Sequence, residues 1–145
     1  MESTLVEQSR LEAKDFLPLN GTDHVEFYVG NAKQSAYYYQ AAWGYELVAY
    51  AGPETGIREY ASYVLQQGKI RIVLTSAFSA THPISQHQLV HGDGVKVLAL
   101  WVDDAKAAYE ATISRGAKSA IPPTVSKDEF GEVVIAAIET YGETI

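Results

Sequence analysis

The chain has 145 residues, 47% of them hydrophobic, and carries a net charge of -7 at pH 7 with no cysteine. This length and composition fit one globular domain with a substantial core, while the acidic balance without a basic cluster argues against nucleic-acid and membrane partners. The lack of cysteine excludes disulfides, thiolate metal sites and a cysteine nucleophile. Because the sequence shows no signal peptide and no long apolar run, we expect a cytoplasmic protein.

The first half of the chain predicts one β-α-β-β-β unit after an N-terminal extension over residues 1–19, in which a short surface helix is expected over 7–14. Alternating apolar and polar side chains in 23–29 predict the first strand. Asn31 is a favourable N-cap for the helix that follows, and Gly44 is a favourable stop. Three further runs predict strands over 45–51, 59–66 and 69–76, the last two joined by a turn at Gln67-Gly68.

The second half of the chain repeats this order. The segment VGNAKQ in 29–34 parallels VDDAKA in 102–107, an offset of 102 − 29 = 73 residues. Such self-similarity indicates two related modules, and we expect a single domain over 20–145. Its parts are module one (20–76), a linker (77–94) and module two (95–145). The linker should contain a short helix over 85–90. Module two should contain a helix over 104–115 and strands over 95–102, 117–121 and 132–140.

Module two is expected to be incomplete. By the repeat, its fourth strand should begin near Glu143, yet the sequence given stops at Ile145. A truncated last strand would leave the sheet edge at 132–140 open to another chain, and it indicates a piece of a longer protein. The alternative is a second module of three strands.

Paired β-α-β-β-β modules that close into a cup-shaped mixed sheet with flanking helices are the hallmark of the vicinal oxygen chelate superfamily, also described as glyoxalase/bleomycin-resistance/dioxygenase-like. We therefore expect this α+β fold class. Within the superfamily, the chain resembles the N-terminal domain of the 4-hydroxyphenylpyruvate dioxygenase family, in order and from residue 20 onward. The stretches that carry the resemblance are DHVEFYVGNAKQ (23–34), LVAYAGPE (47–54), REYASYVL (58–65), IVLTS (72–76), HGDGVK (91–96) and AAIETYGET (136–144).

The resemblance implies a two-domain, iron(II)-dependent enzyme that converts 4-hydroxyphenylpyruvate and O₂ to homogentisate in tyrosine catabolism. It also implies that two His and one Glu of the C-terminal domain hold the iron, so this chain alone is expected to be inactive. Its role would be structural: it packs against the C-terminal catalytic domain of the same polypeptide and contributes to a homo-oligomer. The alternatives are a free-standing small-ligand-binding module, the N-terminal domain of a 4-hydroxymandelate synthase, and a small glyoxalase-like metalloenzyme.

The first strand contains candidate ligands for a metal site of its own. Alternation predicts that His24, Glu26 and Tyr28 point into the cup, where a mononuclear site needs two His and a carboxylate. By the repeat, Val97 stands where a second His should be, and bulky Tyr28 and Trp101 should fill the cup. We therefore expect no catalytic, cofactor-binding or metal-binding residue here, and a His24 that hydrogen-bonds a neighbour such as Glu26.

Two further clusters have no assigned role. His87 and His91 are four residues apart and would share one helix face, as in some zinc sites. The helix is short and Asp93 is the only carboxylate at hand, so surface histidines are the favoured interpretation. The three tyrosines at 37–39 are either an interface patch or part of the core over the sheet.

Overall fold

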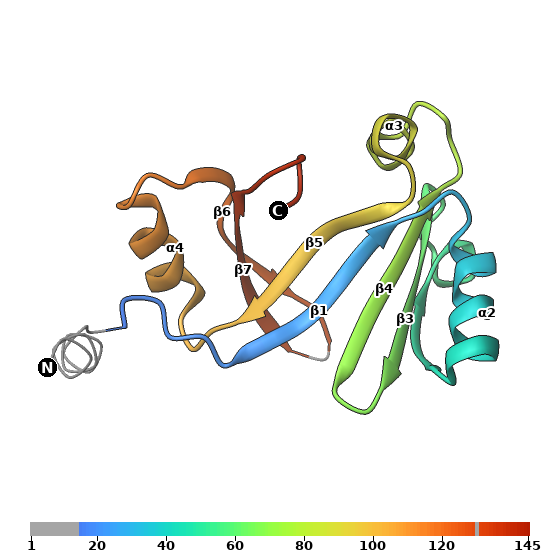
Figure 1. The fold of residues 1–145 in the computed structure, drawn as a ribbon, viewed down its shortest axis with the longest axis horizontal. Coiled ribbons are helices and arrows are strands. Elements are labelled where there is room, and N and C mark those ends of the chain that lie inside the picture. The colour runs from blue at the N-terminus through green and yellow to red at the C-terminus, as the bar shows by residue number, and fades with distance from the viewer. Residues whose placement is uncertain (1–14, 130) are drawn as a thin grey trace, which may run out of the picture. The chain divides into compact units, whose positions relative to one another are not determined.

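The computed structural model describes residues 15–129 and 131–145, so the helix expected over 7–14 lies outside the described residues. The elements in chain order are β1 (Gly21–Tyr28), α2 (Ala32–Trp43), β2 (Glu46–Ala51), η1 (Pro53–Thr55), β3 (Tyr60–Gln67), β4 (Ile70–Ala77), α3 (Pro83–His91), β5 (Gly94–Trp101), α4 (Ala105–Ile113), β6 (Lys118–Lys127) and β7 (Glu132–Glu139) (Figure 1). They fall into two compact units, Gly21–Trp101 with Glu139–Ile145, and Val102–Ile138 with the segment ending at Asn20.

The larger unit is a five-stranded mixed sheet in the order β2-β3-β4-β1-β5. Strands β1 and β4 run parallel, and the other neighbours are antiparallel. Helix α2 lies along one face of the sheet, beside β3 and β4 (Figure 1). The core is between them, and its buried members are Val29, Ala32, Ala36, Leu65, Ile72 and Leu74. The opposite face of the sheet is therefore left for a site.

The pairing of β1 with β5 shows the internal repeat directly. His24 lies opposite Ala99, and Glu26 lies opposite Val97. Because the repeat makes Val97 the counterpart of His24 and Ala99 the counterpart of Glu26, each pair is the image of the other. This two-fold relation is the register expected when two copies of one module meet through their first strands.

The helix boundaries follow from local chemistry that the sequence predicts correctly. The Asn31 side chain accepts a hydrogen bond from the Gln34 backbone N–H, and Asp104 does the same for Ala107 at the start of α4. Both oxygens satisfy N–H groups that a first helical turn leaves without partners. Gly44 ends α2 in the left-handed region, with φ of 74°, where a side chain is disfavoured.

Two sequence-based boundaries are wrong. The hairpin between β3 and β4 turns at Gly68 and Lys69, one residue later than expected, because Gly68 takes the positive φ of 57° that the turn requires. Strand β6 continues to Lys127 rather than ending near residue 121. The strand runs through Pro122 and Pro123, since proline is tolerated at the edge of a two-stranded sheet.

The smaller unit consists of α4 packed on the β6–β7 hairpin. Two contacts tie the segment before β1 to this unit. The Arg115 guanidinium lies 3.7 Å from the centre of the Phe16 ring, and Asn20 donates a hydrogen bond of 2.7 Å to Asp103. Cation–π stacking of this kind contributes modestly at an exposed position.

The last residue described joins the edge of the larger sheet. The Ile145 N–H donates to the Lys96 carbonyl, and the Ile145 carbonyl accepts from the Leu98 N–H, both at 2.9 Å. Lys96 and Leu98 are the two neighbours of Val97 in β5, and a residue that bonds to both neighbours of its partner shows the hydrogen-bond pattern of parallel strands. In module one, β1 and β4 are also parallel. The two hydrogen bonds of Ile145 lie where the repeat predicts the fourth strand of module two, although residues 140–145 form turns and coil and not a regular strand. The α+β class with a mixed sheet and flanking helices is confirmed.

Among the described residues, no helix has the length and apolar character needed to cross a bilayer.

Candidate functional site

The face of the sheet opposite α2 carries a short polar chain. Phe27 packs on the core side, so alternation turns Glu26 and Tyr28 to the other face. There Thr75 of β4 donates to the Glu26 carboxylate at 2.6 Å, and the Ser62 hydroxyl lies 2.8 Å from the Thr75 hydroxyl. The Glu26 carboxylate is thus engaged by a neighbouring strand.

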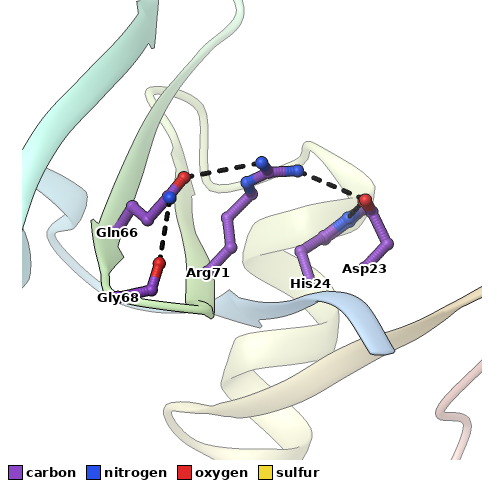
Figure 2. A network of polar contacts seen from close by, with 5 residues as sticks. All are labelled: Asp23, His24, Gln66, Gly68 and Arg71. Carbon is purple, nitrogen blue, oxygen red and sulfur yellow. Dashed lines mark hydrogen bonds and ion pairs between the residues drawn. The ribbon is translucent and has the colours of Figure 1, made fainter. Parts of the chain in front are cut away.

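A second polar network surrounds His24 (Figure 2). The His24 Nδ1 atom lies 2.7 Å from one Asp23 oxygen, and Arg71 contacts the other oxygen at 3.2 Å. Arg71 also reaches the Gln66 side-chain oxygen at 3.4 Å, and Gln66 in turn donates to the Gly68 carbonyl. His24 is partly buried as expected, but its partner is Asp23 and not Glu26. The Glu26 carboxylate is bonded to Thr75.

This face does not fit the iron that the dioxygenase resemblance implies for the full enzyme. The residues of β5 opposite Glu26 and His24 are Val97 and Ala99, which have no ligand atom. The Arg71 cation beside Asp23 also disfavours a dication at this end of the face. A two-His-one-carboxylate set is not assembled by these residues.

Tyr28 and Trp101, which lie in the first strands of the two modules, were both expected to fill the cup. Trp101 does not fill a cup, since its side chain is 62% exposed. Tyr28 is partly buried, and its pKa is raised above the ordinary value, first by burial and then by the nearby charge of Glu26 and the phenol of Tyr60. Its ring meets His87 edge-on, at 5.5 Å between centroids and 89° between planes.

The structure brings together three ionisable groups at the end of α3. The Glu143 Oε2 atom lies 3.1 Å from His91 Nε2 and 3.5 Å from His87 Nδ1. The centroids of the His87 and His91 imidazole rings are 4.4 Å apart. Within residues 15–129 and 131–145, this is the group of His, Asp and Glu side chains whose ligand atoms lie close enough together to hold a metal ion.

The protonation of this cluster follows from its surroundings. Burial lowers the pKa of the His87 imidazole, and the positive charges of Lys96 and His91 act in the same direction. The attraction of Glu143 opposes this shift but is smaller. The hydrogen bond from His91 lowers the pKa of the Glu143 carboxyl. At neutral pH the cluster therefore presents a neutral His87 and an ionised Glu143.

The sequence did not reveal Glu143 as the third member of this cluster. It offered Asp93 as the nearest carboxylate, but Asp93 accepts from the Gly30 backbone N–H at 2.9 Å and from the Gln88 side chain at 3.1 Å. Glu143 lies 52 residues beyond His91 in the chain. The available signal was the repeat, since it predicted that a strand near Glu143 returns to the sheet.

The three consecutive tyrosines at 37–39 were expected to be either part of the core or a surface patch, and the structure shows both environments. Tyr39 packs against the core and meets Tyr45 edge-on at 5.7 Å, whereas Tyr37 and Tyr38 are 71% and 57% exposed. The cluster is therefore core on one side and open surface on the other.

Known proteins support the fold and the resemblance. The model of the Glyoxalase/Bleomycin resistance protein/Dioxygenase superfamily matches residues 21–139. A 4-hydroxyphenylpyruvate dioxygenase of Tetrahymena thermophila is 47% identical over 135 residues, which cover 86% of this chain and 32% of that protein. One of Dictyostelium discoideum is 42% identical over 128 residues, covering 87% and 35%. The match lies in the N-terminal part of these relatives, and the chain spans about a third of their length.

Solved structures of related proteins have the same fold as this chain. A mutant of 4-hydroxymandelate synthase from Streptomyces coelicolor superposes with a TM-score of 0.80 at 26% identity, over 86% of this chain and 36% of that one. A methylmalonyl-CoA epimerase from Mycobacterium tuberculosis has a TM-score of 0.63 at 18% identity, over 86% and 84%, a likeness of fold alone. With the repeat, the mixed sheet and the family match over residues 21–139, the chain belongs to the Glyoxalase/Bleomycin resistance protein/Dioxygenase superfamily.

Proposed function

We propose that this chain is the N-terminal domain of an iron(II)-dependent 4-hydroxyphenylpyruvate dioxygenase and that its role there is structural. In this proposal residues 20–145 form one domain of two modules, and the C-terminal part of the same polypeptide holds the iron. The whole enzyme acts in tyrosine catabolism in the cytoplasm, as a homo-oligomer. The high identity to proteins that carry this name favours the dioxygenase over 4-hydroxymandelate synthase.

The observation that carries a non-catalytic role is the register of β1 and β5. It sets Val97 and Ala99, which have no ligand atoms, against Glu26 and His24 at the centre of the open sheet face. The side chains that remain there are tied to each other, Glu26 to Thr75 and His24 to Asp23. In this proposal, the iron that a chelating substrate requires is therefore held elsewhere in the polypeptide.

The hydrogen bonds of Ile145 support a partner from the same polypeptide. They pair the last described residue with β5 as in a parallel ladder, and this chain spans only about a third of the length of its curated relatives. Unpaired backbone groups on a sheet edge favour pairing with further chain. In this proposal, a further segment of the longer polypeptide extends that pairing along β5.

Oxygen uptake tests this proposal. The chain alone, supplied with Fe²⁺, ascorbate and 4-hydroxyphenylpyruvate, should consume no O₂ above the buffer rate, whereas the natural full-length polypeptide should consume it and release homogentisate. The matched control is His24→Ala in the full-length polypeptide, which should keep most of the turnover because His24 is bonded to Asp23 and lies outside the iron site.

Three results would contradict the proposal in different ways. Turnover by the chain alone would show a catalytic site that the β1–β5 register does not suggest. Release of 4-hydroxymandelate instead of homogentisate would identify the sister synthase. Binding of a small organic ligand by the chain alone, with no loss of activity when the chain is deleted from the full-length polypeptide, would favour a free-standing binding module.

A further inference from the structure

Two histidines project from the end of α3 as a pair. His87 and His91 are separated by one helical turn, which places both rings on the same face of the helix. The His87 side chain is only 10% exposed and is held by the edge of Tyr28, while His91 is 32% exposed. This spacing is the one by which helices present two imidazoles to one metal ion.

The third group comes from the turn that follows β7. The ligand atoms of His87, His91 and Glu143 all lie within 4.8 Å of one another. Ligands about 2.1 Å from a tetrahedral metal ion are about 3.4 Å apart, close to the separations that Glu143 Oε2 already has from the two histidines. Small rotations of the exposed side chains complete the set, and further positions stay open to water.

The Glu143 backbone is held in place by contacts on both sides. Its φ of 62° lies in the left-handed region, which a glutamate rarely adopts. The Lys96 ammonium donates to the Glu143 carbonyl, and the Thr140 hydroxyl donates to the Thr144 carbonyl at 2.8 Å. The Ile145 N–H then bonds to β5. A side chain fixed in an unfavourable backbone region by its surroundings is pre-positioned for a function.

We propose that His87, His91 and Glu143 bind one divalent transition-metal ion, with Zn²⁺ as the preferred ion. Two imidazoles and one carboxylate suit zinc, cobalt or nickel, whereas Mg²⁺ and Ca²⁺ take oxygen ligands. The Lys96 ammonium lies beside the cluster and weakens the affinity without removing a ligand. The ion ties the end of α3 to the turn before Ile145, and thereby to β5. This site is separate from the iron that the proposed function assigns to the C-terminal part.

Titration with Co²⁺ tests this site, because cobalt replaces zinc and its visible absorption reports the coordination. A tag-free chain freed of metal with a chelator should bind one Co²⁺, and Zn²⁺ should displace it and raise the melting temperature. The variants Glu143→Gln and His91→Gln, at solvent-facing ligands, should each weaken binding by at least about tenfold, a loss of about 1.4 kcal/mol. The control His24→Gln removes a histidine beside a different carboxylate and should leave binding unchanged.

Two outcomes would overturn the site. The absence of stoichiometric Co²⁺ and Zn²⁺ binding would show that the cluster is only hydrogen-bonded. The same conclusion would follow if Glu143→Gln and His91→Gln bound metal as the parent chain does, with unchanged circular dichroism.

The oxygen assay separates this inference from the proposed function. Zinc binding without oxygen uptake would support both ideas, whereas a chain that neither binds metal nor consumes O₂ would overturn the metal site alone. Oxygen uptake that depends on Fe²⁺ at these three residues would overturn the structural role and keep the metal site.

Discussion

Tyr50 shows how one exposed contact changes the acidity of a residue. Its hydroxyl donates to the Glu54 carboxylate at 2.5 Å, which joins β2 to the short helix η1. This hydrogen bond is the main reason that the pKa of Tyr50 is raised to about 12 and the pKa of Glu54 is lowered. Loss of the Tyr50 proton would remove the donor and set two negative charges side by side.

The Glu54→Gln variant should bring the pKa of Tyr50 back toward the ordinary value of a tyrosine, because the charged acceptor is gone. The measurement is an NMR titration of chains labelled at the tyrosine Cζ carbon, which resolves Tyr50 from the other phenols. Glu46→Gln, in the same strand but without a contact to Tyr50, is the matched control. An unchanged Tyr50 titration in Glu54→Gln would contradict the assigned cause.

His87 predicts how stability depends on pH. Burial lowers its pKa in the folded chain below the unfolded value of about 6.5, so the folded state binds the proton more weakly. The stability that this group contributes is therefore fully present above that unfolded value and is lost as pH falls through the folded pKa. Glu143 acts in the same direction only at lower pH, since its ordinary pKa is near 4.5.

In the presence of a chelator, the urea midpoint should fall between pH 7.5 and about pH 5.5, where a buried neutral imidazole is forced to take up a proton. His87→Gln should flatten this dependence, because glutamine does not titrate. A steeper fall in the variant than in the parent chain would contradict the role of His87. Urea unfolding followed by circular dichroism at each pH is the measurement.

At the scale of elements, the stability of module one depends on how α2 covers β3 and β4. Leu74 and Leu65 lie beneath the helix with 1% and 0% of their surface exposed, against Ala32 and Ala36. Small residues on the helix let it approach the sheet closely, so the two leucines are almost completely excluded from water.

The Leu74→Ala variant should lower the free energy of unfolding by about 2–5 kcal/mol, because it removes buried apolar surface and leaves a cavity. Ile70→Ala, in the same strand but 58% exposed, should change it by less than about 0.5 kcal/mol. Urea unfolding of both variants gives the comparison. Equal losses in the two variants would show that this layer is not the core of the unit.

At the scale of the whole molecule, the contact between the last residues and β5 lies where the repeat predicts a fourth strand of module two. Among the residues described after β7, the Ile145 backbone bonds to Lys96 and Leu98. The Thr144 hydroxyl also donates to the Val95 carbonyl at 3.2 Å, and the Lys96 ammonium donates to the Glu143 carbonyl. A strand of ordinary length would add several more hydrogen bonds and would cover apolar surface of β5.

Adding about ten residues after Ile145, taken from the corresponding region of the Tetrahymena thermophila relative, should raise the melting temperature. A gain of about 1 kcal/mol corresponds to a rise of roughly 4 °C for a domain of this size. The control carries the same ten residues in scrambled order and should melt like the parent chain. Equal melting temperatures for the parent and both extended chains would contradict a missing strand.

The amino-acid sequence by itself determined the features that depend on local chemistry and on the repeat. Alternation placed the strands, Asn31 and Asp104 fixed the starts of two helices, and the 73-residue offset led to the paired modules. The family followed from the stretches that resemble it. These signals are readable because caps, turns and strand periodicity act within a few residues.

Only the tertiary structure decided which distant side chains meet. Thr75, from another strand, engages Glu26, and Arg71 contacts Asp23, which is also the partner of His24. Glu143 joins His87 and His91 because the chain returns to β5 after β7. Such pairings depend on strand register and on how a late segment returns to the sheet, and residues more than 45 positions apart carry no local signal of them.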